Sequence, residues 1–249
     1  MGIAASDFDK SGTLDLHIAN YQDESVCLYL GQQSSYQDRA VQFGLAGPSL
    51  SVLGFGSQAI DYDNDGLPDL AVTNGHVDKF ETMKGAFEQL PQLFCNLGDR
   101  FQQLEVADPS DYWQTRHLGR SMARLDFNRD GKNDLVITHV GETSALLLNE
   151  TDVSNHWLQL QLIGVQSERD AIGAKIRVRF GSRESTEWVI GGDGYLCRNE
   201  SLVSFGLRDQ ASIDELTVTW PSGRVQTFHN LAADLRLLVI ENQSQPFEL

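Results

Sequence analysis

Three stretches of the chain read Asp7-Phe-Asp-Lys-Ser-Gly-Thr-Leu-Asp-Leu16, Asp61-Tyr-Asp-Asn-Asp-Gly-Leu-Pro-Asp-Leu70 and Asp126-Phe-Asn-Arg-Asp-Gly-Lys-Asn-Asp-Leu135. All three follow the pattern D-x-[DN]-x-[DS]-G-x-x-D-L. Self-similarity of this kind is typical of repeat architectures, in which each copy marks one structural unit. The sequence therefore predicts that residues 1–152 contain three copies of one unit.

The residue types in these stretches are those of a hard-cation site. Oxygen-bearing side chains at loop positions 1, 3 and 5 can converge on one point, and the glycine at position 6 allows the sharp turn. A main-chain carbonyl at position 7 and a carboxylate at position 9, with water, complete the oxygens that calcium prefers, whereas magnesium demands stricter octahedral geometry. The predicted calcium ligands are Asp7, Asp9, Ser11, Thr13 and Asp15 in the first loop, Asp61, Asp63, Asp65, Leu67 and Asp69 in the second, and Asp126, Asn128, Asp130, Lys132 and Asp134 in the third.

Two other interpretations of the loops are weaker. An EF-hand needs a glutamate at position 12, where this chain has Ile18, Val72 and Ile137. A single Asp/Gly turn can simply be solvated, but three sets of crowded carboxylates carry a repulsion that a divalent cation removes. Calcium is therefore the predicted cofactor, and the second loop, with four aspartates, is predicted to bind it most tightly.

Short segments rich in branched residues flank every loop, as expected if each loop joins two β-strands. A further apolar segment follows each pair and predicts a third strand. The segments before the loops are residues 3–5, 57–60 and 122–125, those after the loops are 16–20, 70–74 and 135–139, and the third segments are 26–31, 92–98 and 145–149.

Each unit resembles the FG-GAP or VCBS repeat, because it has a strand, an acidic loop, a second strand and a following apolar segment. The resemblance implies calcium-binding blades of an integrin-like β-propeller. The loops begin 54 and 65 residues apart, which exceeds the roughly 40 to 45 residues of a compact blade and implies insertions, one of them a short helix or loop at residues 77–91. Because a closed propeller usually needs about four to eight blades, either further blades are missing from this chain or the three form an open arc.

Residues 155–249 are predicted to form a second domain. The chain carries 23 acidic and 10 basic side chains in residues 1–154, but 12 and 9 in the rest. Leu158, Leu160 and Leu162 begin a strict alternation of apolar and polar residues, which favours a small antiparallel β-sandwich or barrel-like domain. The fold class is thus all-β, a partial β-propeller followed by this domain. The predicted core of the second domain includes Trp157, Leu160, Val178, Trp220 and Val239.

This second part resembles the ASPIC/UnbV domain. FG-GAP-type repeats followed by such a domain resemble the cartilage acidic protein family and its bacterial relatives. The resemblance implies a secreted, periplasmic or cell-surface location, calcium binding and no established catalysis. The matching stretches are Asn155-His-Trp-Leu, Arg169-Asp-Ala-Ile-Gly-Ala-Lys-Ile-Arg-Val, Gly191-Gly-Asp-Gly-Tyr-Leu, Phe205-Gly-Leu and Val218-Thr-Trp-Pro-Ser-Gly-Arg-Val-Gln.

Composition excludes several classes of partner. A net charge of −16 disfavours nucleic acid, which rewards clustered positive charge. No apolar run approaches the roughly 18 residues of a membrane span, and the first residues do not have the pattern of a signal peptide. Cys27, Cys95 and Cys197 are odd in number and widely spaced, so a disulfide framework is not expected. A protein or glycan partner is expected, besides calcium.

The sequence favours a non-catalytic module over an enzyme. Its six histidines show no H-E-x-x-H spacing, and the glycine-rich stretch at residues 54–59 lacks the second glycine of a nucleophile elbow. The first hypothesis is therefore a calcium-binding adhesion or interaction module of a secreted or cell-surface protein. The alternative is a propeller-based hydrolase or lyase whose active site needs blades that are missing from this chain.

One basic strand raises a further binding prediction. Lys175, Arg177 and Arg179 alternate with Ile176 and Val178, which places three cations on the outward face. They could bind an anion such as an acidic glycan. The alternative, a solvated face of a half-buried strand, is the favoured interpretation.

Overall fold

The computed structural model describes residues 1–79, 86–107 and 110–249, and these ranges are almost entirely β-structure. Five small sheets hold the described strands, and the short helical elements are α1 (Ala46–Ser49) and a 3₁₀ helix (Tyr112–Gln114). The all-β prediction is confirmed. The insertion predicted at residues 77–91 lies partly outside the described residues. Within those residues, no helix has the length and apolar character to cross a membrane.

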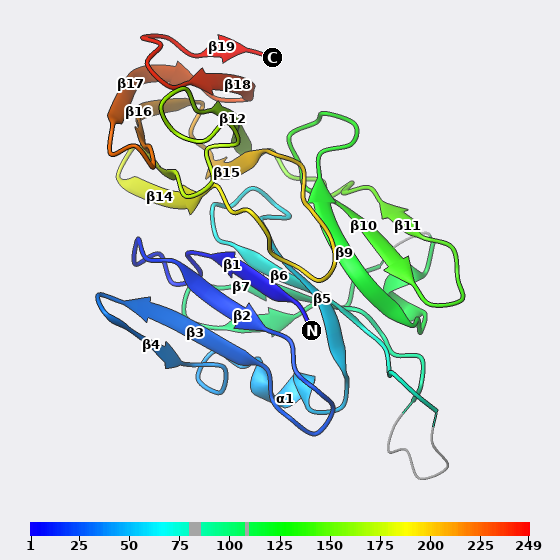
Figure 1. Ribbon diagram of the computed structural model, residues 1–249. Helices are drawn as coiled ribbons and strands as arrows, with labels where there is room; N and C mark the ends of the chain where they lie inside the picture. The colour runs from blue at the N-terminus through cyan, green and yellow to red at the C-terminus, as the bar shows by residue number, and fades with distance from the viewer. Residues whose placement is uncertain (80–85, 108–109) are drawn as a thin grey trace.

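Each acidic loop joins the first two strands of one N-terminal sheet (Figure 1). Neighbouring strands pair antiparallel in chain order. The three strands predicted around each loop are confirmed, and the first two sheets add a fourth strand that was not predicted. The first sheet contains β1 (Ile3–Ser6), β2 (Asp15–Ile18), β3 (Cys27–Gln32) and β4 (Ser35–Asp38), the second β5 (Gly54–Ile60), β6 (Asp69–Asn74), β7 (Gln92–Asn96) and β8 (Phe101–Gln103), and the third β9 (Gly119–Leu125), β10 (Asp134–His139) and β11 (Ala145–Leu147).

The three sheets stack through two shared cores. Phe8 and Leu28 of the first sheet pack in one cluster with Leu70 of the second. Ile60 of the second sheet packs in another cluster with Met122 of the third. The first strands β1, β5 and β9 lie next to one another. This is the face-to-face stacking of successive blades in a partial β-propeller.

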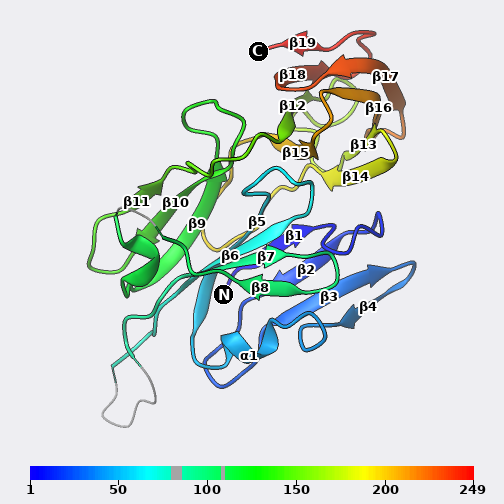
Figure 2. The same ribbon diagram turned by 180° about the vertical axis from the view of Figure 1, so that it is seen from behind.

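Two further four-stranded sheets follow, and they enclose one common core (Figure 2). Most of their strand pairs are antiparallel, as predicted, but β12 and β18 run parallel. Alternation of apolar residues reports which face of a strand is buried and not the direction of its neighbour. One sheet contains β12 (His156–Ile163), β15 (Val203–Arg208), β18 (Leu235–Ile240) and β19 (Phe247–Glu248), and the other β13 (Lys175–Phe180), β14 (Arg183–Trp188), β16 (Ser212–Thr219) and β17 (Val225–Ala232).

Trp157 does not belong to this core, and its prediction as a core residue is wrong. Its neighbour Leu158 points inward, so Trp157 points to the other face of β12. There the indole packs against the third loop, where a Cβ on Gly131 would lie 2.0 Å from the Trp157 ring. The other predicted core residues are buried in the common core: Leu160, Val178, Trp220 and Val239.

The connection between β14 and β15 joins the C-terminal sheets to the first strands of the N-terminal sheets (Figure 1). Gly194 exchanges backbone hydrogen bonds with Ile3 of β1, with N···O distances of 2.6 and 3.1 Å. Asn199 accepts the backbone N–H of Arg124 in β9 and donates to the side chain of Gln58 in β5. The two parts of the chain are therefore in intimate contact, and the predicted division into domains 1–152 and 155–249 stays a prediction.

Candidate metal centres

The three acidic loops share one backbone conformation. The residue at position 4 is left-handed in each, with φ of 58° at Lys10, 55° at Asn64 and 62° at Arg129. The position-6 glycines have φ between 77° and 86°, a region that residues with a Cβ rarely adopt. Three copies of a sequence motif thus fold into three copies of one loop, which explains the need for glycine.

The aspartate at position 1 organises each loop. Its Oδ2 atom accepts the backbone N–H of the position-6 glycine, at 2.9 Å for Asp7, 2.8 Å for Asp61 and 2.9 Å for Asp126. The side chain at position 3 accepts the N–H of position 5 at 3.0 to 3.2 Å. These bonds hold the side chains at positions 1 and 3 on the inside of the turn.

The first two loops gather three carboxylates each, and the oxygens of each group lie within 4.8 Å of one another. In the third loop, the Asn128 amide donates to Asp130 at 3.1 Å, and no group of three carboxylates this close is found among the described residues of that loop. Two of the three loops thus have the donor geometry of a cation site. The groups are Asp7, Asp9 and Asp15 in the first loop and Asp61, Asp63 and Asp65 in the second.

One oxygen in the first cluster lacks a hydrogen-bond partner. Asp7 is 1% exposed, and its Oδ1 atom is buried with no partner among the described residues. A buried carboxylate oxygen without a partner costs free energy. A cation held by Asp7, Asp9 and Asp15 would supply that partner, so the residues of the loop fit the cation that the sequence predicts.

Burial and mutual repulsion raise the pKa values of the loop carboxyl groups. Burial, with a smaller contribution from neighbouring aspartates, raises the pKa of Asp15 to about 7, of Asp61 to about 8 and of Asp69 to about 9. The same causes, burial first, raise the pKa of Asp7 and Asp63. A bound divalent cation would favour the ionised forms and offset this repulsion.

The aspartate at position 9 has a structural role that the sequence pattern did not indicate. In Asp15, Asp69 and Asp134, one oxygen accepts the N–H of position 2, at 2.8, 3.2 and 2.8 Å. The other oxygen accepts an N–H in or just after the third strand of the sheet, at 2.7, 2.8 and 2.7 Å. Position 9 therefore clamps the loop to its sheet. Its place at the start of the second strand was the available signal.

The other predicted ligands lie in the same turns. The Ser11 hydroxyl shares a hydrogen bond with the Thr13 hydroxyl, and Asp130 accepts the N–H of Lys132. The carbonyls of Thr13, Leu67 and Lys132 follow directly on the glycine turn. Their ligation of calcium stays a prediction, as does that of the aspartates.

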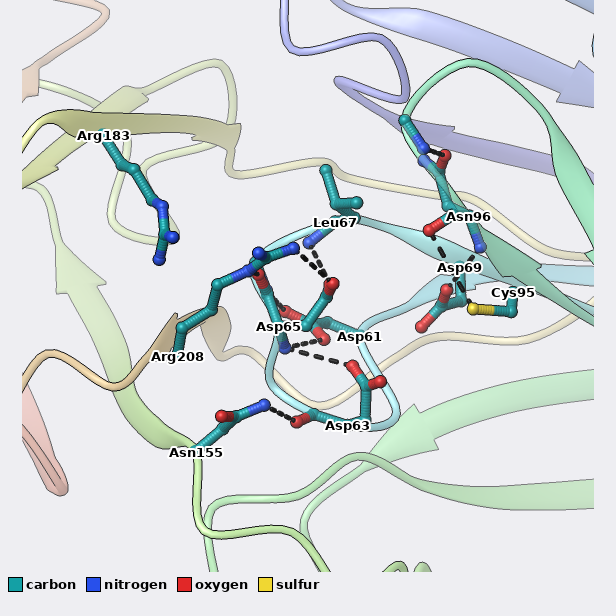
Figure 3. A network of polar contacts seen from close by, with 12 residues as sticks. Asp61, Asp63, Asp65, Leu67, Asp69, Cys95, Asn96, Asn155, Arg183 and Arg208 are labelled. Carbon is teal, nitrogen blue, oxygen red and sulfur yellow. Dashed lines mark hydrogen bonds and ion pairs between the residues drawn. The ribbon is translucent and has the colours of Figure 1, made fainter.

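Polar side chains from the C-terminal sheets contact two loop aspartates, one at position 5 of the second loop and one at position 1 of the third loop. Arg208 of β15 contacts Asp65 of the second loop, with an Nη2···Oδ2 distance of 2.6 Å (Figure 3). Arg236 of β18 and Gln159 of β12 both contact Oδ2 of Asp126 at 3.0 Å. No spacing in the sequence pointed to these residues, because they are distant in the chain from the loops that they contact.

The three cations of β13 have partners of their own. The Lys175 ammonium donates to the carbonyl of Gly12 at 2.8 Å and lies over the Trp188 ring. Arg177 and Arg179 both lie within 4.0 Å of Glu215. An anion would have to displace these contacts, so the structure favours the alternative of a paired, solvated face, and anion binding stays an untested prediction.

Two histidines that are far apart in the sequence lie close together: His117, just before β9, and His139 in β10. The ring of His117 stacks on Tyr112 at a centroid distance of 4.4 Å and lies 4.9 Å from His139. His117 Nδ1 is 2.9 Å from Glu142, and the Tyr112 hydroxyl is 2.9 Å from His139 Nε2. These contacts tie the 3₁₀ helix to β10.

Two parts of the chain match models of known protein families. Residues 7–72, which include the first two loops, match the family model for an FG-GAP-like repeat, and residues 164–246 match the model for ASPIC and UnbV. Fold and loops thus define a chain with FG-GAP-type sheets followed by an ASPIC/UnbV-type part. Both resemblances drawn from the sequence are confirmed.

The chain is also similar to individual curated proteins. It is 30% identical over 241 residues to cartilage acidic protein 1 of Xenopus tropicalis, and 29% identical over 239 residues to that of Mus musculus. The protein of the same name from Homo sapiens is 27% identical over 235 residues. These matches cover 90–91% of this chain and 33–34% of the relatives. The chain therefore spans about a third of the length of the curated relatives that it matches.

Proposed function

We propose that this chain is a calcium-binding, non-catalytic interaction module. Calcium would occupy the first and second loops and fix the geometry of the sheets that they join. The observation that carries the proposal is the buried, unpartnered Oδ1 atom of Asp7 within a group of three carboxylates. The matched FG-GAP-like repeat, which spans both loops, supports the same conclusion.

The proposal also includes an extracellular setting. The relatives are named cartilage acidic protein 1, and cartilage is a tissue rich in extracellular matrix. This likeness supports the proposal of a secreted or cell-surface location, in which the chain would serve adhesion with a protein or glycan as its partner. Calcium is abundant in such a setting, where modules commonly bind it at about 0.1 to 1 mM.

A non-catalytic role is supported by the contacts along the first strands. The β14–β15 connection packs along β1, β5 and β9, through residues such as Gly194 and Asn199. A propeller enzyme with a central active site would need that inner region for its substrate, and here the β14–β15 connection lies against it. The enzymatic alternative therefore has no observation in its favour within the described part of the chain.

Thermal unfolding tests the proposal. A ligand that binds the folded chain at 100 times its dissociation constant adds about 2.7 kcal/mol per site. Calcium at about 10 mM should therefore raise the melting temperature of the calcium-free chain, and magnesium should raise it less because it demands stricter geometry. The variant Asp7→Asn should lose part of the increase.

Asp99→Asn is the matched control, since Asp99 is exposed and pairs with its neighbour Arg100. That variant should respond to calcium as the wild type does. An equal melting temperature with and without calcium in the wild-type chain would overturn the proposal.

A further inference from the structure

The acidic loops are the surface on which the C-terminal sheets rest. The first loop receives Lys175 of β13 on its Gly12 carbonyl. The third loop receives Trp157 of β12 on Gly131. Each loop thus contacts a different part of the C-terminal sheets, and the second loop contacts β15.

The contact at the second loop is between two backbones. A Cβ on Gly206 of β15 would lie 2.1 Å from Oδ2 of Asp61 and 2.5 Å from the carbonyl carbon of Asn64. The N–H of Arg208 donates to the carbonyl of Asn64 at 3.1 Å. Glycine at position 206 is therefore what allows β15 to approach the loop this closely.

The same strand places a guanidinium group in the carboxylate cluster. Arg208 Nη2 lies 2.6 Å from Oδ2 of Asp65, and Arg208 Nε donates to the Asp65 carbonyl (Figure 3). Asp65 belongs to the group formed with Asp61 and Asp63. Asp65, one of the three carboxylates of the predicted cation site, is thus already paired with an arginine from the C-terminal sheets.

We propose that Arg208 and a divalent cation compete for Asp65, so that occupancy of the second loop and docking of β15 on that loop oppose each other. The inference rests on the proposed calcium binding. Two positive charges on one carboxylate repel each other, and the second oxygen of Asp65, Oδ1, already accepts the N–H of Leu67 at 2.8 Å. By linkage, calcium weakens the Arg208 contact by the same factor by which Arg208 weakens calcium binding.

The third loop shows the outcome of a related pairing. Arg236 is buried to a greater extent, with 13% of its side chain exposed against 37% for Arg208. It holds Oδ2 of Asp126 with the help of Gln159. Because Arg236 is too buried to move away from Asp126, the third loop should be the weakest of the three cation sites. Arg208 is exposed enough to move away from Asp65.

Calorimetric titration of the full chain with calcium chloride tests the competition. Arg208→Gln should bind calcium at one site roughly tenfold more tightly, the scale set by one charge removed at contact distance. Arg183→Gln is the matched control. It removes the same charge, but Arg183 pairs with Asp209 at 3.5 Å and not with a loop aspartate. Its affinity should stay that of the wild type.

Amide hydrogen exchange on the wild-type chain gives a second measurement that needs no variant. Calcium should speed exchange at the Arg208 amide, which donates to Asn64, and slow it within the second loop. Two results can overturn the inference, and they differ. Absence of any calcium binding by the wild type refutes the proposed function and the coupling together. Wild-type binding with unchanged affinity in Arg208→Gln and unchanged exchange at Arg208 refutes the coupling alone.

Discussion

Single aspartates within one loop do different work, although the sequence motif treats them alike. In the second loop, Asp69 at position 9 is 2% exposed and accepts two backbone N–H groups, from Tyr62 and Asn96. The carboxylate of Asp63 at position 3 accepts the N–H of Asp65 within the loop, and only the Asp63 carbonyl reaches outside it, to Asn155. We therefore propose that in the second loop position 9 serves the fold and position 3 serves the cation.

Substituting these two residues should separate stability from calcium binding. Asp69→Ala leaves two backbone donors without their acceptor and should lower the free energy of unfolding by about 2–4 kcal/mol even without calcium. Asp63→Ala should change the calcium-free stability by less than about 1 kcal/mol and abolish most of the stabilisation by calcium at that loop. Denaturant unfolding with and without calcium measures both. Equal losses in the calcium-free chain would contradict this division of roles.

Residue types and spacing were enough to predict that carboxylates converge in the first two loops, because position and chemistry are local in a turn. Two other residues show where such prediction stops. Trp157 was assigned to the core although its parity along β12 is opposite to that of Leu158, and parity decides the face of a strand. Arg208 could not be found at all, since it contacts Asp65 from 143 positions away.

At the scale of elements, β15 and the second loop fit because one residue has no side chain. Gly206→Ala would bring a methyl group against Asp61 and the backbone of Asn64. We expect the variant to be destabilised by about 1–3 kcal/mol, because backbone must move to relieve the overlap. Gly192→Ala is the matched control, since a Cβ there has nothing within 4 Å. Thermal melts of the two variants that coincide would show that β15 does not pack here as described.

Each loop should also respond to pH as a unit. Folding raises the pKa of Asp15, Asp61 and Asp69 from 3.8 to about 7, 8 and 9. Between about pH 4 and pH 9, the calcium-free folded chain therefore binds protons that the unfolded chain has lost, so its stability falls as the pH rises. Calcium needs the ionised groups and gains at high pH.

The increase in melting temperature caused by calcium should thus be larger at pH 8 than at pH 5. Scanning calorimetry at both values, on calcium-free and calcium-loaded chain, measures it. A smaller increase at pH 8 would show that the loop carboxyl groups are not those that bind the ion.

Strands around each loop were predictable for a physical reason: the motif places a turn between two apolar segments. The fourth strands of the first two sheets were not, because β4 (Ser35–Asp38) is exposed throughout and carries no apolar pattern. The parallel pairing of β12 and β18 was equally hidden, since partners far apart in the chain leave no local signal of direction.

At the scale of the whole molecule, the C-terminal sheets have a core of their own and rest on the loops of the other part. We therefore propose that residues 155–249 fold alone and that residues 1–152 do not stay soluble alone. Excision would remove the β14–β15 connection from β1, β5 and β9 and leave sheet faces without a neighbour.

Separate expression tests this division. The 155–249 fragment should melt cooperatively and give dispersed amide spectra, with Trp157 more exposed than in the full chain. The 1–152 fragment should bind a dye that reports exposed apolar surface. A disordered C-terminal fragment beside a monomeric, cooperatively folded N-terminal one would reverse the assignment. Motif and composition predict a division near residues 152–155, which stays a prediction, but they give no sign that the C-terminal sheets contact the acidic loops.

Equilibrium dialysis against labelled calcium, after all metal has been removed from the full chain, tests the central claim most directly. At about 1–10 mM calcium, the range for extracellular modules, we predict two strongly bound ions per chain, one each at the loops of Asp7 and Asp61. Asp7→Asn and Asp61→Asn should each remove one. A wild-type chain that retains no calcium, or variants that keep the wild-type stoichiometry, would contradict the account.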